Sequence, residues 1–471
     1  MARRLFAAFL ATACLTLPAA AQAQTPAPGP NPQAEAQALD LLKHGIAFKT
    51  VEGPANQTFD YATYLKSELV AGGFAEEDVT VTKLGDTAYL VARYRGTGKA
   101  KGGAKPLYLS GHMDVVAANP KDWERDPFTP VIENGYIFGR GATDMKYDLS
   151  TMIATLIQLK REGFKPGRDI LLLASGDEET DMKTTAALAE QYHDGELLLN
   201  IDGGGGAMGE DGKPLGFGID GAEKTYADFE LTYTNAGGHS SAPRPVNAIY
   251  QLSAALTKIG DYKFPGQVNE ITRASLAASA EGAPPEIAEA IRRFLADQTD
   301  PQALSVLRAA PGFVGQIGTT CVATMVDAGH ARNALPQRAT ANVNCRIFPG
   351  TPVKDVQATL AQVVGDPEMK IVEVDTGSIA SPASPLRPDL MALVTKAIHA
   401  RYPGIPVVPS MASGASDSMH FRARGVPSYG VSPIFMKGSD SFSHGLNERT
   451  PLSEISPSIV YYKTLLTTLA K

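Results

Sequence analysis

Residues 107–146, LYLSGHMDVVAANPKDWERDPFTPVIENGYIFGRGATDMK, decide the fold and carry the first candidate site residues. The stretch opens with Leu107-Tyr108-Leu109, an apolar run that predicts a buried strand. His112 and Asp114 follow at once, and residues two apart on an extended backbone point to the same side. A histidine that binds a metal through one ring nitrogen needs an acceptor for the other, which a carboxylate can provide. His112 is therefore a candidate metal ligand, and Asp114 is a candidate orienting group.

Alternating strand and helix patterns after this point predict an α/β domain. Gly139-Arg140-Gly141 indicates a tight turn that leaves Asp144 on a loop, and the pattern predicts a helix over 148–162. Two nearly pure apolar runs, 169–174 and 197–201, are typical of strands at the centre of a covered sheet. We therefore expect a mixed, mainly parallel sheet flanked by helices.

The pattern changes after these strands and predicts an inserted unit. Residues 227–234 alternate between apolar and polar side chains, which is typical of a half-exposed strand. Helix-like and strand-like segments follow as far as Pro349-Gly350. We interpret residues 223–348 as an inserted α+β domain, and we assign residues 35–222 and 349–471 to the α/β domain.

The N-terminal segment has the composition of a signal peptide. Two arginines precede an apolar run, and Ala21-Gln22-Ala23 matches an A-x-A cleavage site. We interpret residues 1–23 as a signal peptide and residues 24–34 as a linker, and we expect a periplasmic or secreted protein. Lipoprotein processing at Cys14 is less favoured, because Ala11-Thr12-Ala13 before it is a poor processing signal.

Composition excludes several other classes of protein. The chain has 471 residues, of which 44% are hydrophobic, enough for two or three domains with cores. Its net charge is -7 and it has no basic patch, so we expect no nucleic-acid partner. No later apolar run is long enough to span a membrane. Cys321 and Cys345, the cysteines beyond the signal segment, can form one disulfide or be two small core residues.

Ligand-type side chains also follow the two central predicted strands. Glu178 and Glu179 follow the first, Asp202 follows the second, and His444 lies in a Gly/Ser loop near the C-terminus. Taken singly, each residue is typical of a solvated surface. Together with the histidine and loop aspartate of residues 107–146, they form a donor set suited to zinc or a similar divalent ion. In open α/β sheets, ligands bind at these strand ends.

The motifs that contain these residues resemble the M20 family of zinc metallopeptidases and amidohydrolases, which includes carboxypeptidases, aminoacylases, acetylornithine deacetylase and succinyl-diaminopimelate desuccinylase. The matching segments occur in the family's order from about residue 35 to the C-terminus. They are GHMDVV (111–116), DPF (126–128), GRGATDMK (139–146), SGDEET (175–180), NIDGGGG (200–206), GGHSSAP (237–243), NVNCRIFPG (342–350), SGASDS (413–418) and SHGLNE (443–448). The resemblance implies a di-zinc exopeptidase-like fold whose inserted domain serves as a lid and as a dimerisation surface.

The resemblance also implies a role for each ligand-type residue. His112 and Asp202 would hold one Zn²⁺, Glu179 and His444 would hold a second, and Asp144 would bridge the two ions, with Co²⁺ or Mn²⁺ as possible substitutes. In addition, Asp114 would orient the first histidine, and Glu178 would act as the general base on a bridging water. The family also has a cis peptide after the bridging aspartate, here Asp144-Met145.

Four further residues match family positions that contact the substrate. His239, in the inserted domain, would reach into the active site of a partner subunit and stabilise an oxyanion. Arg346 would bind the substrate carboxylate, Asn333 would contribute to the same pocket, and the Gly414 loop would lie beside it. The family often has GGTSD where this chain has Gly414-Ala415-Ser416-Asp417, which leaves the details of the pocket open.

These observations predict a secreted di-zinc hydrolase that cleaves an amide bond in peptides, as a carboxypeptidase or dipeptidase, or in N-acyl amino acids with a free carboxylate. The alternative is a catalytically silent periplasmic protein that binds metal or peptide on the same scaffold. Glu178 favours the enzyme, because a binding protein needs no carboxylate beyond the metal ligands. A serine hydrolase is not favoured, because the chain has no G-x-S-x-G elbow around Ser416 or Ser418.

Overall fold

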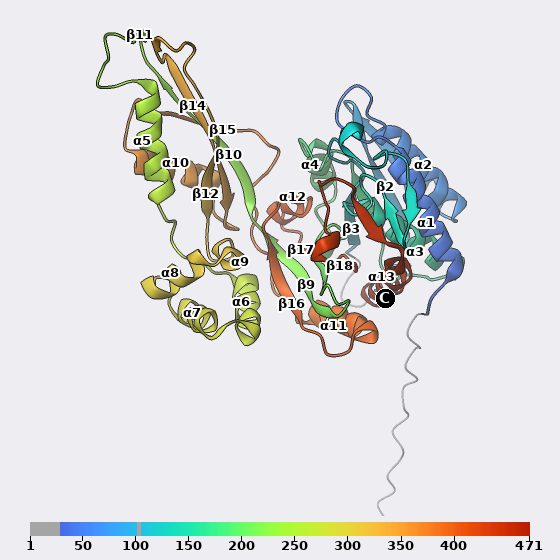
Figure 1. The fold of residues 1–471 in the computed structure, drawn as a ribbon. Coiled ribbons are helices and arrows are strands. Elements are labelled where there is room, and N and C mark those ends of the chain that lie inside the picture. Colours follow the sequence, from blue (N-terminus) through green and yellow to red (C-terminus); the bar gives the residue numbers. More distant parts are fainter. Residues whose placement is uncertain (1–28, 101–104) are drawn as a thin grey trace, which may run out of the picture.

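A ten-stranded sheet forms the centre of the larger of two units in the computed structural model, which describes residues 29–100 and 105–471 (Figure 1). Its strands follow the order β1-β2-β6-β3-β7-β17-β9-β8-β18, and β16 pairs with β9. They are β1 (Val79–Leu84), β2 (Thr87–Tyr94), β3 (Leu107–His112), β6 (Ile170–Ser175), β7 (Leu197–Asn200), β8 (Gly205–Met208), β9 (Pro214–Glu223), β16 (Val407–Ala412), β17 (Ser428–Gly430) and β18 (Phe435–Lys437).

The central strands of this sheet are parallel and its edge carries antiparallel pairs. β3 pairs in parallel with β6 and β7, and β17 pairs in parallel with β7. β1, β2 and β6 pair in antiparallel fashion. The predicted mixed, mainly parallel α/β sheet is therefore confirmed.

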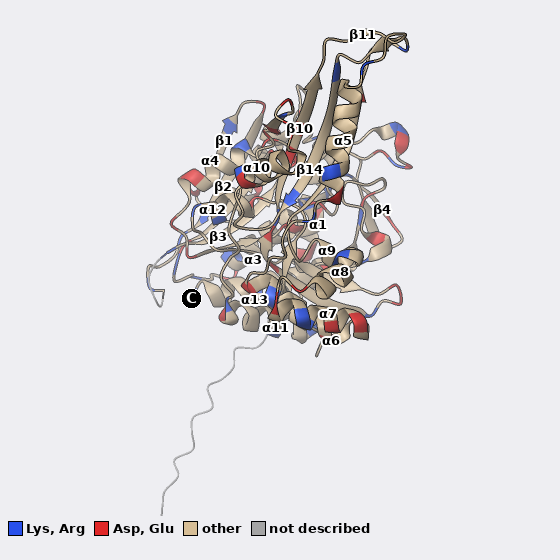
Figure 2. Cartoon of the chain, turned by 90° about the vertical axis from the view of Figure 1, so that its left-hand side faces the viewer, with Lys and Arg blue, Asp and Glu red and all other residues tan. Residues whose placement is uncertain are grey.

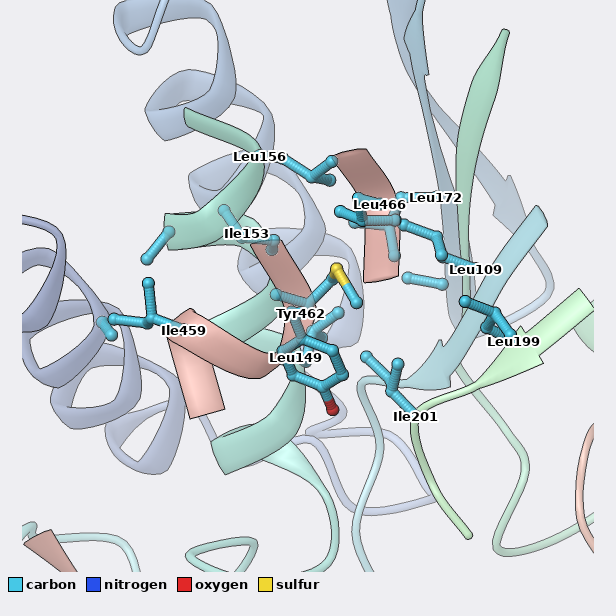
Figure 3. Packing of buried hydrophobic residues seen from close by; sticks show 14 of the residues in the cluster. Leu109, Leu149, Ile153, Leu156, Leu172, Leu199, Ile201, Ile459, Tyr462 and Leu466 are labelled. Carbon is cyan, nitrogen blue, oxygen red and sulfur yellow. The ribbon is translucent and has the colours of Figure 1, made fainter. Parts of the chain in front are cut away.

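Helices cover both faces of this sheet. On one face, α3 and α13 present Leu149, Ile153 and Leu466 to Leu109 and Leu172 of the strands (Figure 3). The helices of this unit are α1 (Pro32–Ala47), α2 (Thr58–Ala71), α3 (Lys146–Arg161), α4 (Lys183–Gln191), α11 (Pro388–Arg401), α12 (Ser418–Ala423) and α13 (Ile455–Leu469). A small three-stranded sheet of β4 (Val131–Glu133), β5 (Tyr136–Phe138) and β19 (Arg449–Pro451) lies beside them.

The second unit is built on a four-stranded sheet in the order β12-β14-β10-β15. Helices α5 and α10 both pack on one face of this sheet, so neither of them covers the other face. The elements are β10 (Thr225–Thr234), α5 (Ala248–Asp261), β12 (Thr320–Ala328), β14 (Arg338–Ile347), α10 (Val353–Val364) and β15 (Lys370–Val374). A two-stranded tip, β11 (Gly238–His239) and β13 (Ala334–Leu335), lies at the far end of the unit (Figure 1).

The inserted unit extends beyond residue 348, where the sequence pattern had suggested its end. β15 pairs with β10, and Val356, Leu360 and Val364 of α10 pack in the core of the same sheet. Pro349-Gly350 is therefore a turn within the unit. A helical group between α5 and β12 adds a separate apolar cluster formed by α6 (Glu270–Gly282), α7 (Pro285–Ala296), α8 (Pro301–Ala309) and α9 (Pro311–Val314).

Three further expectations concern the cysteines, the N-terminal segment and membrane spans. Cys321 and Cys345 lie opposite each other on β12 and β14 and form a disulfide. The proposed signal peptide and Cys14 lie outside the described residues, and α1 begins at Pro32, inside the predicted linker. Within the described part of the chain, no helix combines the length and apolarity needed to cross a membrane. Basic and acidic residues are mixed on the face shown in Figure 2.

Candidate active site

The site lies at the carboxyl ends of three parallel neighbours in the large sheet. β3 ends at His112, β6 leads into the loop with Glu178 and Glu179, and β7 leads to Asp202. Parallel strands that pair side by side bring these ends together. The ligand-type residues that are separate in sequence therefore meet at one edge of the sheet.

His112 is held so that one ring nitrogen faces the carboxylates. Its Nδ1 lies 3.0 Å from the main-chain oxygen of Asp114, and its Nε2 lies 3.1 Å from Asp144 Oδ1 and 3.7 Å from Asp202 Oδ2. A carbonyl oxygen only accepts, so Nδ1 carries the hydrogen in the neutral ring and Nε2 is left with its lone pair. The ring is only 1% exposed, which fixes this orientation by packing.

The Asp114 carboxylate was expected to contact the His112 ring, but its shorter contacts are to the loop that carries Glu178 and Glu179. Its oxygens accept hydrogen bonds from the main-chain N–H groups of Glu178 and Glu179, at 3.1 and 3.0 Å, and Oδ1 lies 3.5 Å from the His112 ring. The main-chain oxygen of Asp114, at the shorter distance, orients the ring. Asp114 thus ties β3 to the loop that carries both glutamates.

The second histidine reaches the cluster from a distant part of the sequence. His444 Nε2 lies 2.9 Å from the Glu179 carboxylate and 3.3 Å from Asp144 Oδ2. Its hydrogen bonds to the carboxylates of Asp144 and then Glu179 raise the pKa of His444 to about 10. Burial alone would raise the pKa of Asp144, but its hydrogen bonds to His112 and His444 lower it. Asp144 therefore lies between the two histidines, and its peptide bond to Met145 is cis.

These contacts produce two groups of metal-ligand type that share Asp144. Ligand atoms of His112, Asp144 and Asp202 lie within 4.8 Å of one another, as do those of Asp144, Glu179 and His444. A third such group joins His112 with the two adjacent glutamates. The donor set of imidazole nitrogen and carboxylate oxygen fits zinc and similar ions.

Glu178 differs from its neighbour in its surroundings. Its Oε2 lies 4.0 Å from His112 Nε2, and its side chain is 9% exposed. Burial raises the pKa of Glu178 well above its ordinary value, although His112 opposes this shift. Burial has the same effect on the pKa of Asp202. Crowded buried carboxylates are stabilised by a bound cation, so the electrostatics of the cluster also fit a metal site.

Two buried carboxylates that sequence reasoning did not single out support the cluster. Glu448 is fully buried, pairs with Arg140 at 2.7 Å, and accepts from the main-chain N–H groups of Gly141, Thr143 and Asp144. Asp417 accepts from Ser175 Oγ at 2.7 Å and from Ser110 Oγ at 3.2 Å, and burial raises its pKa to about 6. Both residues lie in motifs that resemble the family, SHGLNE and SGASDS. Their presence in these motifs is the sequence signal that could have identified them.

The glycines after Asp202 have a structural explanation. Gly204 has φ of +76°, and a side-chain carbon there would lie 2.6 Å from the main-chain oxygen of Gly430 and 2.7 Å from that of Gly218. The run therefore lets the chain pass close to β17 and β9.

Arg346 lies at the end of β14 that is close to the large sheet. Its guanidinium stacks on the Tyr226 ring, 4.6 Å from the ring centre, and Nη1 lies 3.3 Å from the main-chain oxygen of Ser413. Gly414 is the next residue, and nothing lies within 4 Å of where its side chain would start. Arg346 and the Gly414 loop are therefore neighbours, as expected.

His239 and Asn333 lie at the opposite end of the inserted unit. Ser240 N–H donates to the main-chain oxygen of Asn333, and His239 Nδ1 accepts from Ser241 N–H at 3.1 Å. Asn333 was expected in the pocket of Arg346, but strand β14 separates them by about 25 Å within one chain. The tip carries both residues away from the metal-ligand cluster of its own chain (Figure 1).

Comparison with known proteins shows which family and which relatives the chain resembles. A model of the peptidase family M20/M25/M40 matches residues 108–468. The chain is 29% identical over 376 residues to the N-fatty-acyl-amino acid synthase/hydrolase PM20D1 of Xenopus tropicalis, covering 77% of this chain and 72% of that protein. It is 27% identical over 377 residues to the probable carboxypeptidase S-like 2 of Dictyostelium discoideum, covering 77% and 71%.

Solved structures have the same fold at low sequence identity. The M20 family metallo-carboxypeptidase Sso-CP2 of Sulfolobus solfataricus superposes with a TM-score of 0.69 at 18% identity, over 92% of this chain and 98% of that one. Human carnosine dipeptidase 1 has a TM-score of 0.62 at 14% identity, over 93% and 97%. With the matched family model spanning most of its length, this chain belongs to the M20 family of metallopeptidases and amidohydrolases.

Proposed function

We propose that the protein is a secreted two-zinc hydrolase that cleaves the amide bond of peptides or N-acyl amino acids bearing a free carboxylate. The observation that carries this proposal is the pair of donor groups that share Asp144, with Glu178 beside them. Relatives named as a carboxypeptidase and as N-fatty-acyl-amino acid hydrolases support the same substrate classes.

The proposed metal assignment follows the two donor groups. His112 and Asp202 would hold one Zn²⁺, Glu179 and His444 the other, and Asp144 both; Co²⁺ or Mn²⁺ would substitute. When bound, the ions would lower the pKa of a water molecule and polarise the amide carbonyl. Glu178 is not needed as a ligand in this arrangement, so it is free for proton transfer.

The residues of the chain perform the remaining steps. Glu178 removes a proton from the attacking water and delivers it to the leaving nitrogen, for which a pKa raised by burial suits the acid form. His239 donates from Nε2 to the developing oxyanion, since its Nδ1 is already an acceptor for Ser241. Arg346 binds the substrate carboxylate with two parallel hydrogen bonds, and the Gly414 loop lies beside it.

The position of His239 supports a homodimer through residues 223–348. The tip that carries His239 and Asn333 is remote from its own site, so a second copy would supply both residues to the pocket of Arg346. β12 is an edge strand, and Val322, Met325 and Val326 on it are 60%, 70% and 61% exposed. An edge with apolar side chains is unusual unless another chain pairs with it.

Secretion is supported by the pattern of residues 1–23 and by the disulfide between Cys321 and Cys345. Structural disulfides persist mainly in oxidising compartments such as the periplasm and the extracellular space.

A substrate panel tests the proposal. Protein stripped with a chelator and reloaded with Zn²⁺ is assayed on dipeptides and on N-acyl amino acids of increasing acyl length, each with a free and an amidated C-terminus. Hydrolysis should require metal and favour the free carboxylate. Full turnover by metal-free protein, or no turnover of any amide by the reloaded protein, would overturn the proposed function.

A further inference from the structure

Lys224 is a buried cation that the family-derived roles leave unexplained. It links β9 to β10, is 1% exposed, and its Nζ has one hydrogen-bond partner among the described residues, Thr320 Oγ1 at 3.4 Å. A side-chain carbon on Gly315 would lie 3.9 Å from this amine, so the amine lies against the end of α9. It forms no ion pair with any described carboxylate, which is unusual because a buried charge is costly without a partner.

The register of the inserted sheet puts this amine beside Arg346. Tyr226 pairs with Arg346 across β10 and β14, and Thr320 pairs with Arg346 from β12. Lys224 precedes Tyr226 by two residues on extended chain, so both side chains point to the same side of the sheet. Burial and then Arg346 lower the pKa of Lys224 to about 8, which agrees with a neighbouring positive charge and no nearby acid.

Arg346 also lacks a carboxylate partner among the described residues. Its contacts are the Tyr226 ring and the main-chain oxygen of Ser413. The acid that faces this region, Asp228, already accepts from Tyr226 Oη at 2.6 Å, and from Asn342 and Asn344 at 2.8 and 2.9 Å. These bonds saturate Asp228 and anchor the ring on which Arg346 stacks.

We infer that Lys224 supplies the second positive charge of an anion pocket, so that the substrate carboxylate is held by Arg346 with Lys224 behind it. The inference rests on the proposed function and deepens it by naming a specificity-determining residue. Two adjacent cations that form no ion pair with a described carboxylate repel each other, and a bound carboxylate relieves that repulsion. An ordinary structural lysine would instead have its own acid partner.

The test compares Lys224→Met, which keeps the length of the side chain and removes its charge, with wild type. Arg346→Ala serves as the positive control. Lys354→Met is the matched control, because Lys354 is exposed on α10 and its loss changes the net charge equally. Binding of N-acetyl-L-leucine and of its amide is measured by calorimetry on metal-free protein, where nothing is turned over. Metal content and melting temperature of each variant are measured in parallel.

Lys224→Met should weaken binding of the free acid about 10–100-fold, the range expected for loss of one partner of a desolvated charged contact. It should leave binding of the amide unchanged, and zinc content after reloading should equal that of wild type. In the zinc-loaded enzyme, the same variant should raise KM for free-carboxylate substrates with kcat changed less than about threefold.

Equal binding of the acid by Lys224→Met and wild type would overturn the inference, as would equal losses for the acid and the amide. In that case Lys224 is a packing residue, and its replacement by methionine should raise the melting temperature only. Failure of the proposed function is a different result. It would be a lack of amide hydrolysis by the zinc-loaded wild-type protein, whatever the behaviour of Lys224→Met.

Discussion

At the scale of single residues, adjacent glutamates have separate environments. Glu179 contacts His444 directly, whereas Glu178 contacts neither histidine more closely than 4.0 Å. Both are fixed by the Asp114 carboxylate through their main-chain N–H groups. In the proposed mechanism, this shared anchor presents Glu179 as a metal ligand and Glu178 as the general base.

Substitution of the two glutamates should therefore have different effects. Glu178→Gln should keep both metals and lose turnover by about 10²–10⁴-fold, as expected for a general base. Glu179→Ala should lose metal because the second donor group loses a ligand. Metal analysis together with steady-state kinetics checks both outcomes, and the reverse pattern would exchange the two assigned roles.

His420 is a buried histidine that should make stability depend on pH. Burial lowers the pKa of His420 to about 4 from its ordinary value near 6.5; its Nε2–H donates to the main-chain oxygen of Gly377. Because the pKa is lower in the folded state, the unfolded chain takes up the proton at a higher pH than the folded chain does as the pH falls. The stabilisation is complete above about pH 6.5 and is lost as the pH falls toward about 4, amounting to about 3 kcal/mol.

His420→Gln should remove this contribution, because glutamine can donate to Gly377 but does not titrate. The measurement is the free energy of unfolding in urea at pH 7 and pH 4, on metal-free protein so that metal release does not contribute. The difference between wild type and variant should change by about 3 kcal/mol between these pH values. His193→Gln, at an exposed position, is the control; the same change there would contradict the assignment to His420.

At the scale of elements, the loop from Gly139 to Asp144 depends on one distant carboxylate. Glu448 accepts three main-chain N–H groups of this loop and pairs with Arg140. The loop has no regular secondary structure to satisfy these groups, so Glu448 sets the position of the shared aspartate. Buried partners of this kind usually matter to a metal site nearly as much as the ligands do.

Glu448→Gln should weaken metal affinity about 10–100-fold, because the amide NH₂ would face a main-chain N–H group. Competition with a chromophoric chelator gives the affinity. Glu286→Gln, at an exposed position on α7, is the control and should leave the metal affinity unaltered. Unchanged zinc affinity in a folded Glu448→Gln protein would mean that the loop holds its shape without this residue.

At the scale of the whole molecule, two residues with proposed roles in the site lie at opposite ends of an elongated unit. Arg346 is at the end of β14 near the large sheet, and His239 is at the tip beyond its other end. A rigid four-stranded sheet keeps them apart in one chain. A complete site therefore needs two chains in our proposal.

Mixing two inactive variants tests this requirement directly. Glu178→Gln and His239→Ala chains, each inactive alone, are unfolded together, refolded and assayed. Random pairing makes half of the dimers mixed, and each mixed dimer has one site with both functional residues, so about a quarter of wild-type activity should return. No recovery, or full activity of His239→Ala alone, would show that the tip does not serve a partner's site.

The sequence by itself determined the elements and the identity of the donor residues, because both depend on local pattern. Apolar runs predicted β3, β6 and β7, and the ligand-type residues stood directly at their ends. In α5 the side chain of Asn247 caps the first turn of the helix, a local feature that the sequence encodes directly. No helix was predicted over α6, although Asn269 and Thr272 form a capping box at its start, because its polar and alanine-rich composition gives a weak apolar period.

Only the tertiary structure decided which distant residues complete each local feature. β15 joins the inserted sheet through pairing with β10, which no local pattern encodes, so the domain boundary at 348 was placed too early. Glu448 and Asp144 are about 300 residues apart, and the role of Glu448 depends on main-chain groups that carry no sequence signature. The burial of Lys224, with no carboxylate partner in the described part of the chain, likewise results from the packing of α9 and β12 around it, and a lysine in a sequence does not reveal its surroundings.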